Sequence, residues 1–232
     1  MKDGGSKVFP AKKQRRENKL TPYLFLLPTI LLMGTFIYYP FVKTIGTSFF
    51  LTNATGKAVE FIGLENYQKV FSDSLFIQSI KNTFIYALIQ VPVTIVLAFL
   101  MAMAANKKRK ASWLYELTFA FPMAVSMSVA ALIFKLMLNP QIGIVNHIFG
   151  LDVQWFNGEK TALLSVIILG VWLGLGMDFL YLLSAVRSVP DDLIEAARID
   201  GCPNWKLMFK IYLPIMSPTV FYLICTNLAT AM

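Results

Sequence analysis

The chain has 232 residues, of which 56% are apolar and 15% charged, and its mean hydropathy is +0.61. Soluble domains carry about 45–50% apolar and about 25% charged residues, so this composition excludes an ordinary soluble enzyme and a disordered tail. The formal net charge of +8 could by itself indicate nucleic acid or an anionic membrane surface as a partner. We therefore expect a membrane protein whose topology depends on where the basic residues lie.

Apolar runs of membrane-spanning length occur along most of the chain. About 20 helical residues cross a hydrocarbon core of about 30 Å, and four runs reach that length, at residues 20–42, 83–105, 114–138 and 162–186. A fifth apolar run, 217–232, has 16 residues and reaches the end of the sequence. It is either partly inserted or cut short. The sequence predicts an all-α polytopic membrane helix bundle with five spans.

Three parts follow one another along the chain. Residues 1–19 form a basic tail, residues 20–75 the first span with an outer segment, and residues 76–232 the core transmembrane domain. The first apolar run exceeds the roughly 7–15 residues of a signal-peptide core, so we expect an uncleaved anchor.

Lysine and arginine positions predict the orientation of the spans. The tail holds seven basic residues, and the loops after the second and fourth spans hold four each, which places fifteen of the 21 on one side. The opposite loops, 43–82 and 139–161, hold five. Because basic residues accumulate in cytoplasmic loops, we place the amino terminus in the cytoplasm. The positive net charge is then explained by the topology and by contact of the tail with anionic lipid. We expect no nucleic acid as a partner.

The sequence contains no pattern typical of catalysis or of a bound cofactor. Cys202 falls in a loop and Cys225 in a span, so we expect no disulfide, and His147 stands alone in an outer loop. No metal-type spacing and no phosphate-binding G-x-x-x-x-G-K-[ST] run is present. An integral-membrane enzyme would need a nucleophile, a metal cluster or paired acids. We therefore expect no catalytic residue, no metal and no cofactor in this chain.

A cytoplasmic loop at residues 187–216 carries the strongest local signals. A capping-box pattern from Ser188 to Asp191, with Pro190 in the first turn, predicts a helix start. That helix is predicted to run to Asp200, and Gly201 suits its left-handed cap. A second short helix should follow from Pro203 and Asn204, and two prolines, Pro214 and Pro218, should mark the entry to the last span.

The same loop contains a known signature. Glu195-Ala196-Ala197, three residues, Gly201, nine residues and then Ile211-x-Leu213-Pro214 resembles the EAA loop of permease subunits of binding-protein-dependent ABC importers. The resemblance implies that this helix-turn-helix docks on a separate ATPase subunit, which would hold ATP and magnesium. The residues implied in docking are Glu195, Ala196, Ala197, Asp200, Gly201, Trp205, Phe209, Ile211, Leu213 and Pro214.

Further segments resemble one branch of these permeases, the carbohydrate-uptake type related to maltose and glycerol-3-phosphate systems. They lie at residues 22–28, 61–67, 81–83, 139–143 and 174–179. Such permeases continue with another outer loop and a sixth span, so we expect that the given sequence lacks the C-terminal span. The resemblance implies a bacterial cytoplasmic-membrane location and three kinds of partner: a second homologous permease, ATPase subunits and an extracytoplasmic solute-binding protein.

Candidate residues in the spans have two readings each. Asp178, where the resembling family more often has asparagine, either lines the substrate path, or it reaches the inner mouth of the bundle or pairs with a polar group of a neighbouring helix. Trp172 and Tyr181 either stack on a sugar ring, or they pack against other helices or face lipid. The small residues Gly170, Gly174 and Gly176 favour close helix packing, with a partner permease as one candidate.

The function implied by the resemblance is therefore transport and not catalysis. A sugar or oligosaccharide is the first choice of solute, and glycerol-3-phosphate or a glycerophosphodiester is the alternative. A membrane scaffold that binds an ATPase without transporting is the alternative from another class.

Overall fold

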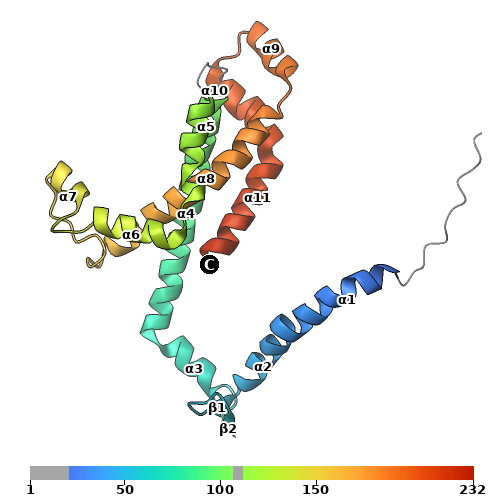
Figure 1. Ribbon diagram of the computed structural model, residues 1–232, viewed down its shortest axis with the longest axis vertical. Coiled ribbons are helices and arrows are strands. Elements are labelled where there is room, and N and C mark those ends of the chain that lie inside the picture. Colours follow the sequence, from blue (N-terminus) through green and yellow to red (C-terminus); the bar gives the residue numbers. More distant parts are fainter. Residues whose placement is uncertain (1–20, 107–111) are drawn as a thin grey trace, which may run out of the picture. The chain divides into compact units, whose positions relative to one another are not determined.

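The computed structural model describes residues 21–106 and 112–232. The predicted basic tail at 1–19 and the basic run 107–110 lie outside these residues. Within the described ranges, four helices are long and apolar enough to cross a membrane, at Pro22–Thr47, Ser74–Ala105, Ala162–Arg187 and Asn204–Ala231. The described residues are mostly helical, and the strands among them form one two-stranded hairpin (Figure 1).

Contacts divide the chain into two units, Met1–Ser74 and Leu75–Met232. In the first unit, α1 (Thr21–Met33), the π-helical turn η1 (Gly34–Tyr38) and α2 (Tyr39–Thr47) form one rod. The π turn ends at Tyr38, two residues before Pro40, and the Tyr39 N–H donates to the Gly34 carbonyl. A proline has no N–H for a helical bond, and the π turn absorbs that interruption without breaking the rod.

A small outer element completes the first unit. Strand β1 (Phe50–Thr52) pairs antiparallel with β2 (Ala58–Phe61), and α3 (Glu65–Ser72) follows. The Asn66 amide donates to the carbonyls of Ser48 and Phe50 at 2.9 and 3.1 Å, and the Ser48 hydroxyl lies 2.7 Å from that of Tyr67. Asn66 and Tyr67, both in the 61–67 segment, thus hold α3 against the start of the β1–β2 hairpin.

Helix α8 (Ala162–Arg187) is central to the second unit. It packs against α4 (Ser74–Ala105), α5 (Ser112–Ala120) and α11 (Leu213–Ala231), which lie along it in Figure 1. The hydrophobic core lies between these helices, and Phe179 and Leu182 of α8 are fully buried in it. A carboxylate, Asp178, is buried at the edge of this core.

The expected third span, 114–138, is not a straight helix. Helix α5 continues into the 3-10 turn η2 (Phe121–Ala124), and α6 (Met127–Met137) then starts at an angle of 98°. Val125 and Ser126 have extended backbone at the break, and the Ser126 hydroxyl accepts a hydrogen bond from the Val129 N–H. The apolar run is continuous in sequence, but this serine cap starts a new helix.

The expected second short helix is also not separate from the last span. Helix α10 (Asn204–Leu207), the π-helical turn η3 (Met208–Tyr212) and α11 form one apolar rod, Asn204–Ala231. The Leu213 N–H donates to the Met208 carbonyl, one residue before Pro214. As at Pro40, a π turn accommodates the proline. The last apolar helix is therefore 28 residues long and begins 13 residues before the predicted run at 217.

A loop with the short helix α7 (Ile144–Phe149) connects α6 to α8. Its shape rests on Asn146, which is buried and accepts a hydrogen bond from the Trp155 indole at 2.6 Å. The Asn146 amide donates to the Val153 carbonyl at 3.0 Å, and the Ser165 hydroxyl of α8 donates to the Trp155 carbonyl at 2.9 Å. These bonds attach the loop to the start of α8.

Candidate functional site

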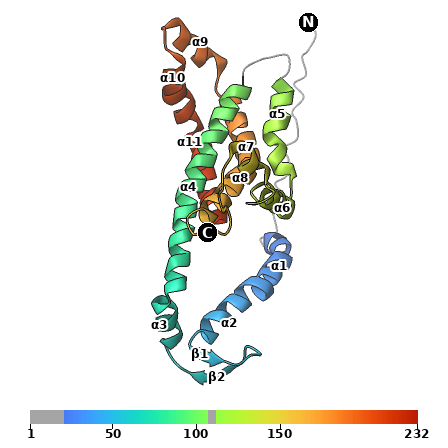
Figure 2. The same ribbon diagram turned by 90° about the vertical axis from the view of Figure 1, so that its left-hand side faces the viewer.

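The loop singled out by the sequence forms a helical hairpin at the end of the bundle where α4 ends and α5 begins (Figure 2). Its first helix is α9 (Asp191–Ile199), and α10 returns toward the bundle. We call residues 191–207 the α9–α10 hairpin. The predicted capping box is wrong, because Pro190 is the N-cap residue and the Ser188 hydroxyl donates to the Ala185 carbonyl at 2.7 Å.

The turn between the two helices is closed by a Schellman motif. Gly201 has φ +71°, and its N–H donates to the Arg198 carbonyl at 3.0 Å. The next N–H, of Cys202, donates to the Ala197 carbonyl at 2.9 Å. Both bonds are those of a helix that ends in a left-handed residue, which glycine adopts without steric cost. The predicted left-handed cap at Gly201 is confirmed.

Buried side chains anchor the hairpin to the bundle. Ile194 of α9 and Leu207 of α10 are 8% and 3% exposed, and Ile194 belongs to the same core cluster as Tyr212. Other apolar side chains of the hairpin and the following turn point outward. They are Leu193, Ile199, Trp205 and Phe209, with exposed fractions of 48, 87, 61 and 56%.

The signature residues lie mainly on the outer surface of this hairpin. Glu195 and Ala196 are exposed and Ala197 is half-buried. Beyond the turn, Ile211 is half-buried against the core, whereas Leu213 and Pro214 are exposed. The hairpin therefore presents an exposed carboxylate, small side chains that permit a close approach, and apolar anchors.

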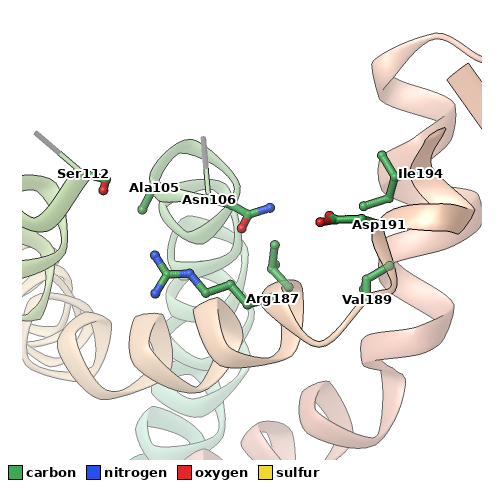
Figure 3. Close-up of a pocket in the computed structure, with 8 residues that line it drawn as sticks. Ala105, Asn106, Ser112, Arg187, Val189, Asp191 and Ile194 are labelled. Atoms are coloured by element: carbon green, nitrogen blue, oxygen red, sulfur yellow. The ribbon is translucent and has the colours of Figure 1, made fainter. Parts of the chain in front are cut away.

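A cavity of about 300 Å³ lies beside the base of α9. It is enclosed by the ends of α4 and α8 and the starts of α5 and α9, and in Figure 3 the Asn106 amide and the Asp191 carboxylate point toward each other across it. Its lining residues are Ala105, Asn106, Ser112, Val186, Arg187, Val189, Asp191 and Ile194.

An ion pair joins the end of α8 to α5. Arg187 Nη2 lies 2.6 Å from Glu116 Oε1, and Nη1 donates to Oε2 at 3.4 Å. The two side chains are 47% and 29% exposed. Arg187 is the last residue of α8, so the pair lies at the point where the chain leaves the bundle for the hairpin.

Asp178 is paired across two helices. The Asn227 amide of α11 donates to the Asp178 carboxylate at 2.8 Å, and Asp178 is 4% exposed. This geometry supports pairing with a neighbouring helix. The role in a substrate path stays a prediction.

The two candidate aromatic residues each lie against another ring. Trp172 packs on Phe134 of α6 with centroids 5.5 Å apart, and Tyr181 packs on Tyr222 of α11, also at 5.5 Å. Tyr181 is 40% exposed, and Trp172 is partly buried. Stacking of either ring on a sugar stays a prediction.

The small residues of α8 lie against helices of this same chain. A Cβ at Gly174 would lie 3.0 Å from Thr94 Cγ2 of α4, and Gly170 faces Tyr86 and Gln90 of α4. At Gly176 a Cβ would lie 2.6 Å from the Met123 backbone nitrogen of η2. The close approach of α8 to α4 and η2 thus depends on the absence of a side chain at these glycines.

Hydrogen bonding strengthens the α4–α8 contact. The Gln90 amide donates to the Thr94 hydroxyl at 3.1 Å and to the Gly170 carbonyl at 3.5 Å, and the Thr94 hydroxyl donates back to the Gln90 carbonyl at 2.8 Å. Gln90 and Thr94 are buried.

Over residues 21–106 and 112–232, no group of three or more His, Cys, Asp or Glu side chains is placed to hold a metal ion.

The amino-acid sequence matches the binding-protein-dependent transport system inner membrane component over residues 94–232. This range includes α8, the α9–α10 hairpin and α11. The chain belongs to this family. The permease resemblance read from the EAA loop is thereby confirmed, as is the polytopic helical fold, and the protein is a multi-pass membrane protein and a transport subunit.

Relatives of the permease are similar over most of their length. The probable ABC transporter permease protein YurN of Bacillus subtilis is 32% identical over 93% of this chain and 76% of its own length. The sn-glycerol-3-phosphate transport system permease protein UgpA of Agrobacterium fabrum is 30% identical over 96% of this chain and 74% of its own length.

Solved structures of a bacterial alginate ABC transporter have the same fold as the permease. One, of a transporter that imports the acidic polysaccharide alginate, aligns with TM-score 0.73 and 26% identity, over 89% of this chain and 71% of the other. The second is of such a transporter in complex with an alginate pentasaccharide-bound periplasmic protein, with TM-score 0.72 and 26% identity over 89% and 70%.

Sequence reasoning missed the partners in the permease's cross-helix pairs. Asn227 is an amide within an apolar run, a signal that marks it as a candidate, but its position 49 residues from Asp178 gives no hint of the pairing. Arg187 and Glu116 are 71 residues apart and were equally unlinked. Only the packing of α8 against α5 and α11 brings these groups together.

Proposed function

We propose that this permease is a subunit of an ATP-driven importer and that its α9–α10 hairpin docks on a separate ATPase subunit. The observation that carries the proposal is the hairpin itself. It is folded by a complete Schellman turn and anchored by Ile194 and Leu207, yet Ile199 and Trp205, and Phe209 in the turn that follows, are more than half exposed. Exposed apolar side chains on a rigid element are typical of a binding surface.

The exposed groups match a helix-in-groove mode of recognition. Trp205 and Phe209 supply apolar anchors, and aromatic anchors dominate binding energy when a partner buries them. Ala196 permits a close approach of the partner backbone, and Glu195 offers an anionic hydrogen-bond acceptor. The groove on the ATPase would therefore be apolar, with a cationic or N–H donor at its edge.

The remaining partners follow from the kind of transporter. The hairpin would lie in the cytoplasm together with the amino terminus, as the distribution of basic residues predicts. A second homologous permease would complete the path, and an extracytoplasmic solute-binding protein would deliver the solute. The alginate transporter complexed with a periplasmic protein supports that last role.

The transport cycle uses no covalent chemistry in this chain. ATP and magnesium would be bound by the ATPase subunits, whose closure would pull on the hairpin. Because α8 enters the hairpin and the α10–α11 rod leaves it, that pull would act on both helices at once. The path would thereby change from inward-facing to outward-facing.

A sugar or oligosaccharide is the proposed solute. Residues 162–186 of α8 and 213–231 of α11 contain no Lys or Arg, whereas a phosphorylated solute favours cationic partners. The alginate transporter supports a saccharide. Glycerol-3-phosphate is the alternative, supported by the UgpA relatives at about 30% identity.

Purification and reconstitution test this function. The tagged permease would be isolated from its own host with its bound subunits, placed in liposomes, and assayed for ATP hydrolysis and uptake with its binding protein. The solutes would be maltose, maltotriose, an alginate trisaccharide and glycerol-3-phosphate. We expect an ATPase in the complex and uptake of a saccharide. Uptake of glycerol-3-phosphate alone would support the alternative, and an ATPase without solute-stimulated hydrolysis or uptake would indicate a scaffold.

A further inference from the structure

The bidentate ion pair between Arg187 and Glu116 lies at the end of α8, where the chain leaves the bundle for the α9–α10 hairpin. Exposed ion pairs contribute only about 0–1 kcal/mol to stability, so stabilisation is a weak reason for this one. A guanidinium that contacts both oxygens of a carboxylate fixes the relative orientation of the two groups. The two contacts here, at 2.6 and 3.4 Å, fix the end of α8 to α5.

The link from Arg187 to α9 is short and ordered. The Ser188 N–H donates to the carbonyls of Ser184 and Ala185, and the Ser188 hydroxyl donates to Ala185 as well. Val189 is 4% exposed, and its N–H donates to the Val186 carbonyl. A displacement of α9 is therefore transmitted to Arg187 and not absorbed by a flexible linker.

Open space lies on both sides of Arg187. The cavity of about 300 Å³ separates parts of α9 from the end of α4 and the start of α5. A second hollow, of about 380 Å³, is a shallow depression open to the surface, lined by Glu116, by Arg187 and neighbouring residues of α8, and by Ser188. Close packing resists motion, so these hollows leave room for the end of α8 to shift. The ion pair is a polar contact through which such a shift would move α5 as well.

Deeper in the bundle, α5 and α8 are held by apolar contacts. Phe119 and Phe179 form an edge-to-face ring pair with centroids 5.4 Å apart. Apolar contacts are non-directional and allow small sliding of packed helices. The ion pair between Arg187 and Glu116 fixes the position of α8 relative to α5 at the end of the bundle near the α9–α10 hairpin. The ring pair does not fix this position.

We infer that Glu116 and Arg187 are positioning residues that make α5 move with the α9–α10 hairpin when the ATPase closes. This inference rests on the proposed docking function. The pair acts through α5 and touches neither solute nor nucleotide. It extends the moving unit beyond α8 and the α10–α11 rod to a helix that is distant in sequence from the hairpin.

The test measures helix movement in the intact transporter in nanodiscs. Cys202 and Cys225 would be replaced by serine, and spin labels would be placed at the exposed Leu117 of α5 and Leu100 of α4. A second label pair, Asp192 of α9 with Leu100, reports the hairpin itself. Distances would be measured without nucleotide and after trapping with ATP and vanadate, in wild type, Glu116→Gln, Arg187→Gln and the charge swap Glu116→Arg with Arg187→Glu.

We expect both distances to shift in wild type. In each single variant the α9 shift should persist and the α5 shift should be lost, and the swap should restore it. If the ion pair only stabilised the fold, the single variants would have lower thermal stability but would not lose the α5 shift selectively. An unchanged α5 shift in the single variants, or no restoration in the swap, would overturn the inference. Absence of a bound ATPase in wild type would instead overturn the proposed function and the inference with it.

Discussion

The Asn227 amide donates a 2.8 Å hydrogen bond to the buried carboxylate of Asp178, and this bond joins α11 to α8. These are the two apolar helices on either side of the α9–α10 hairpin. A polar bond between them, away from water, specifies one alignment of the helices. We therefore treat the pair as a fixed reference within the bundle, in contrast to the exposed pair at Arg187.

Removal of one partner should cost more than removal of both. Asn227→Leu leaves the Asp178 carboxylate without this donor, and an unsatisfied buried polar group costs about 1–3 kcal/mol. We expect a lower unfolding midpoint for Asn227→Leu in thermal scans of the purified permease. The double variant Asp178→Leu with Asn227→Leu should lie closer to wild type. Equal midpoints for Asn227→Leu and wild type would contradict this account of the bond.

Transport separates the two roles of Asp178. Asp178→Asn keeps the size of the side chain and an acceptor for Asn227, so it should retain uptake if the pairing with α11 is the role of the residue. A large loss of uptake in Asp178→Asn, with an unchanged unfolding midpoint, would instead indicate contact with the solute. Uptake in proteoliposomes at several solute concentrations makes the distinction.

Gly176 should tolerate no side chain. Its Cβ would lie 2.6 Å from a backbone nitrogen of η2, so that Gly176→Ala forces the helices apart. Overpacking of this kind costs about 1–3 kcal/mol. Gly46→Ala in α2 is the matched control, since nothing lies within 4 Å of its Cβ. Thermal unfolding should show a loss at Gly176 and no loss at Gly46, and equal effects would contradict the packing.

Gly201 tests the turn of the hairpin without changing its contacts. Its φ is +71° and nothing lies within 4 Å of its Cβ, so Gly201→Ala would introduce backbone strain alone. A left-handed alanine costs about 1–2 kcal/mol. Hydrogen exchange at the α9 amides should accelerate in Gly201→Ala and less so in Gly201→Asn, which tolerates this region better. Exchange that stays at the wild-type rate would contradict the Schellman turn.

The exposed and buried apolar residues of α10 should behave differently. Trp205 is 61% exposed, so Trp205→Ala should leave the unfolding midpoint unchanged while less ATPase co-purifies. Leu207 is 3% exposed, so Leu207→Ala should lower the unfolding midpoint, because truncation of a core leucine costs about 2–5 kcal/mol of the free energy of unfolding. Phe221→Ala, on the exposed face of α11, controls for loss of any exposed ring. Retained ATPase in Trp205→Ala would contradict docking through that side chain.

The sequence predicted those features that depend on local patterns. The capping glycine at 201 requires only its own conformation, and the apolar runs require only composition. Pro122 indicates a kink in the third apolar run, but the start of a new helix at Val125–Ser126 was not predicted, because the apolar run continues through it. The continuous rod through Pro214 was missed because a π turn is not apparent from residue types.

The cross-helix pairs depend on tertiary packing and were beyond local reasoning. Asp178 could be recognised as costly in a span, but its partner lies on a helix that returns from the far side of the hairpin. The glycines of α8 indicated close packing, and only the fold shows that α4 and η2 occupy that space.

Site-specific photo-crosslinking in the native membrane tests the central claim most directly. A benzophenone amino acid would replace Ile199 on α9, which is 87% exposed, or Ile142 in the loop before α7, which is 78% exposed. We predict that position 199 crosslinks to an ATP-binding subunit and that position 142 does not. Crosslinking of the ATPase from position 142 and not from 199 would contradict the assignment of the α9–α10 hairpin as its docking site.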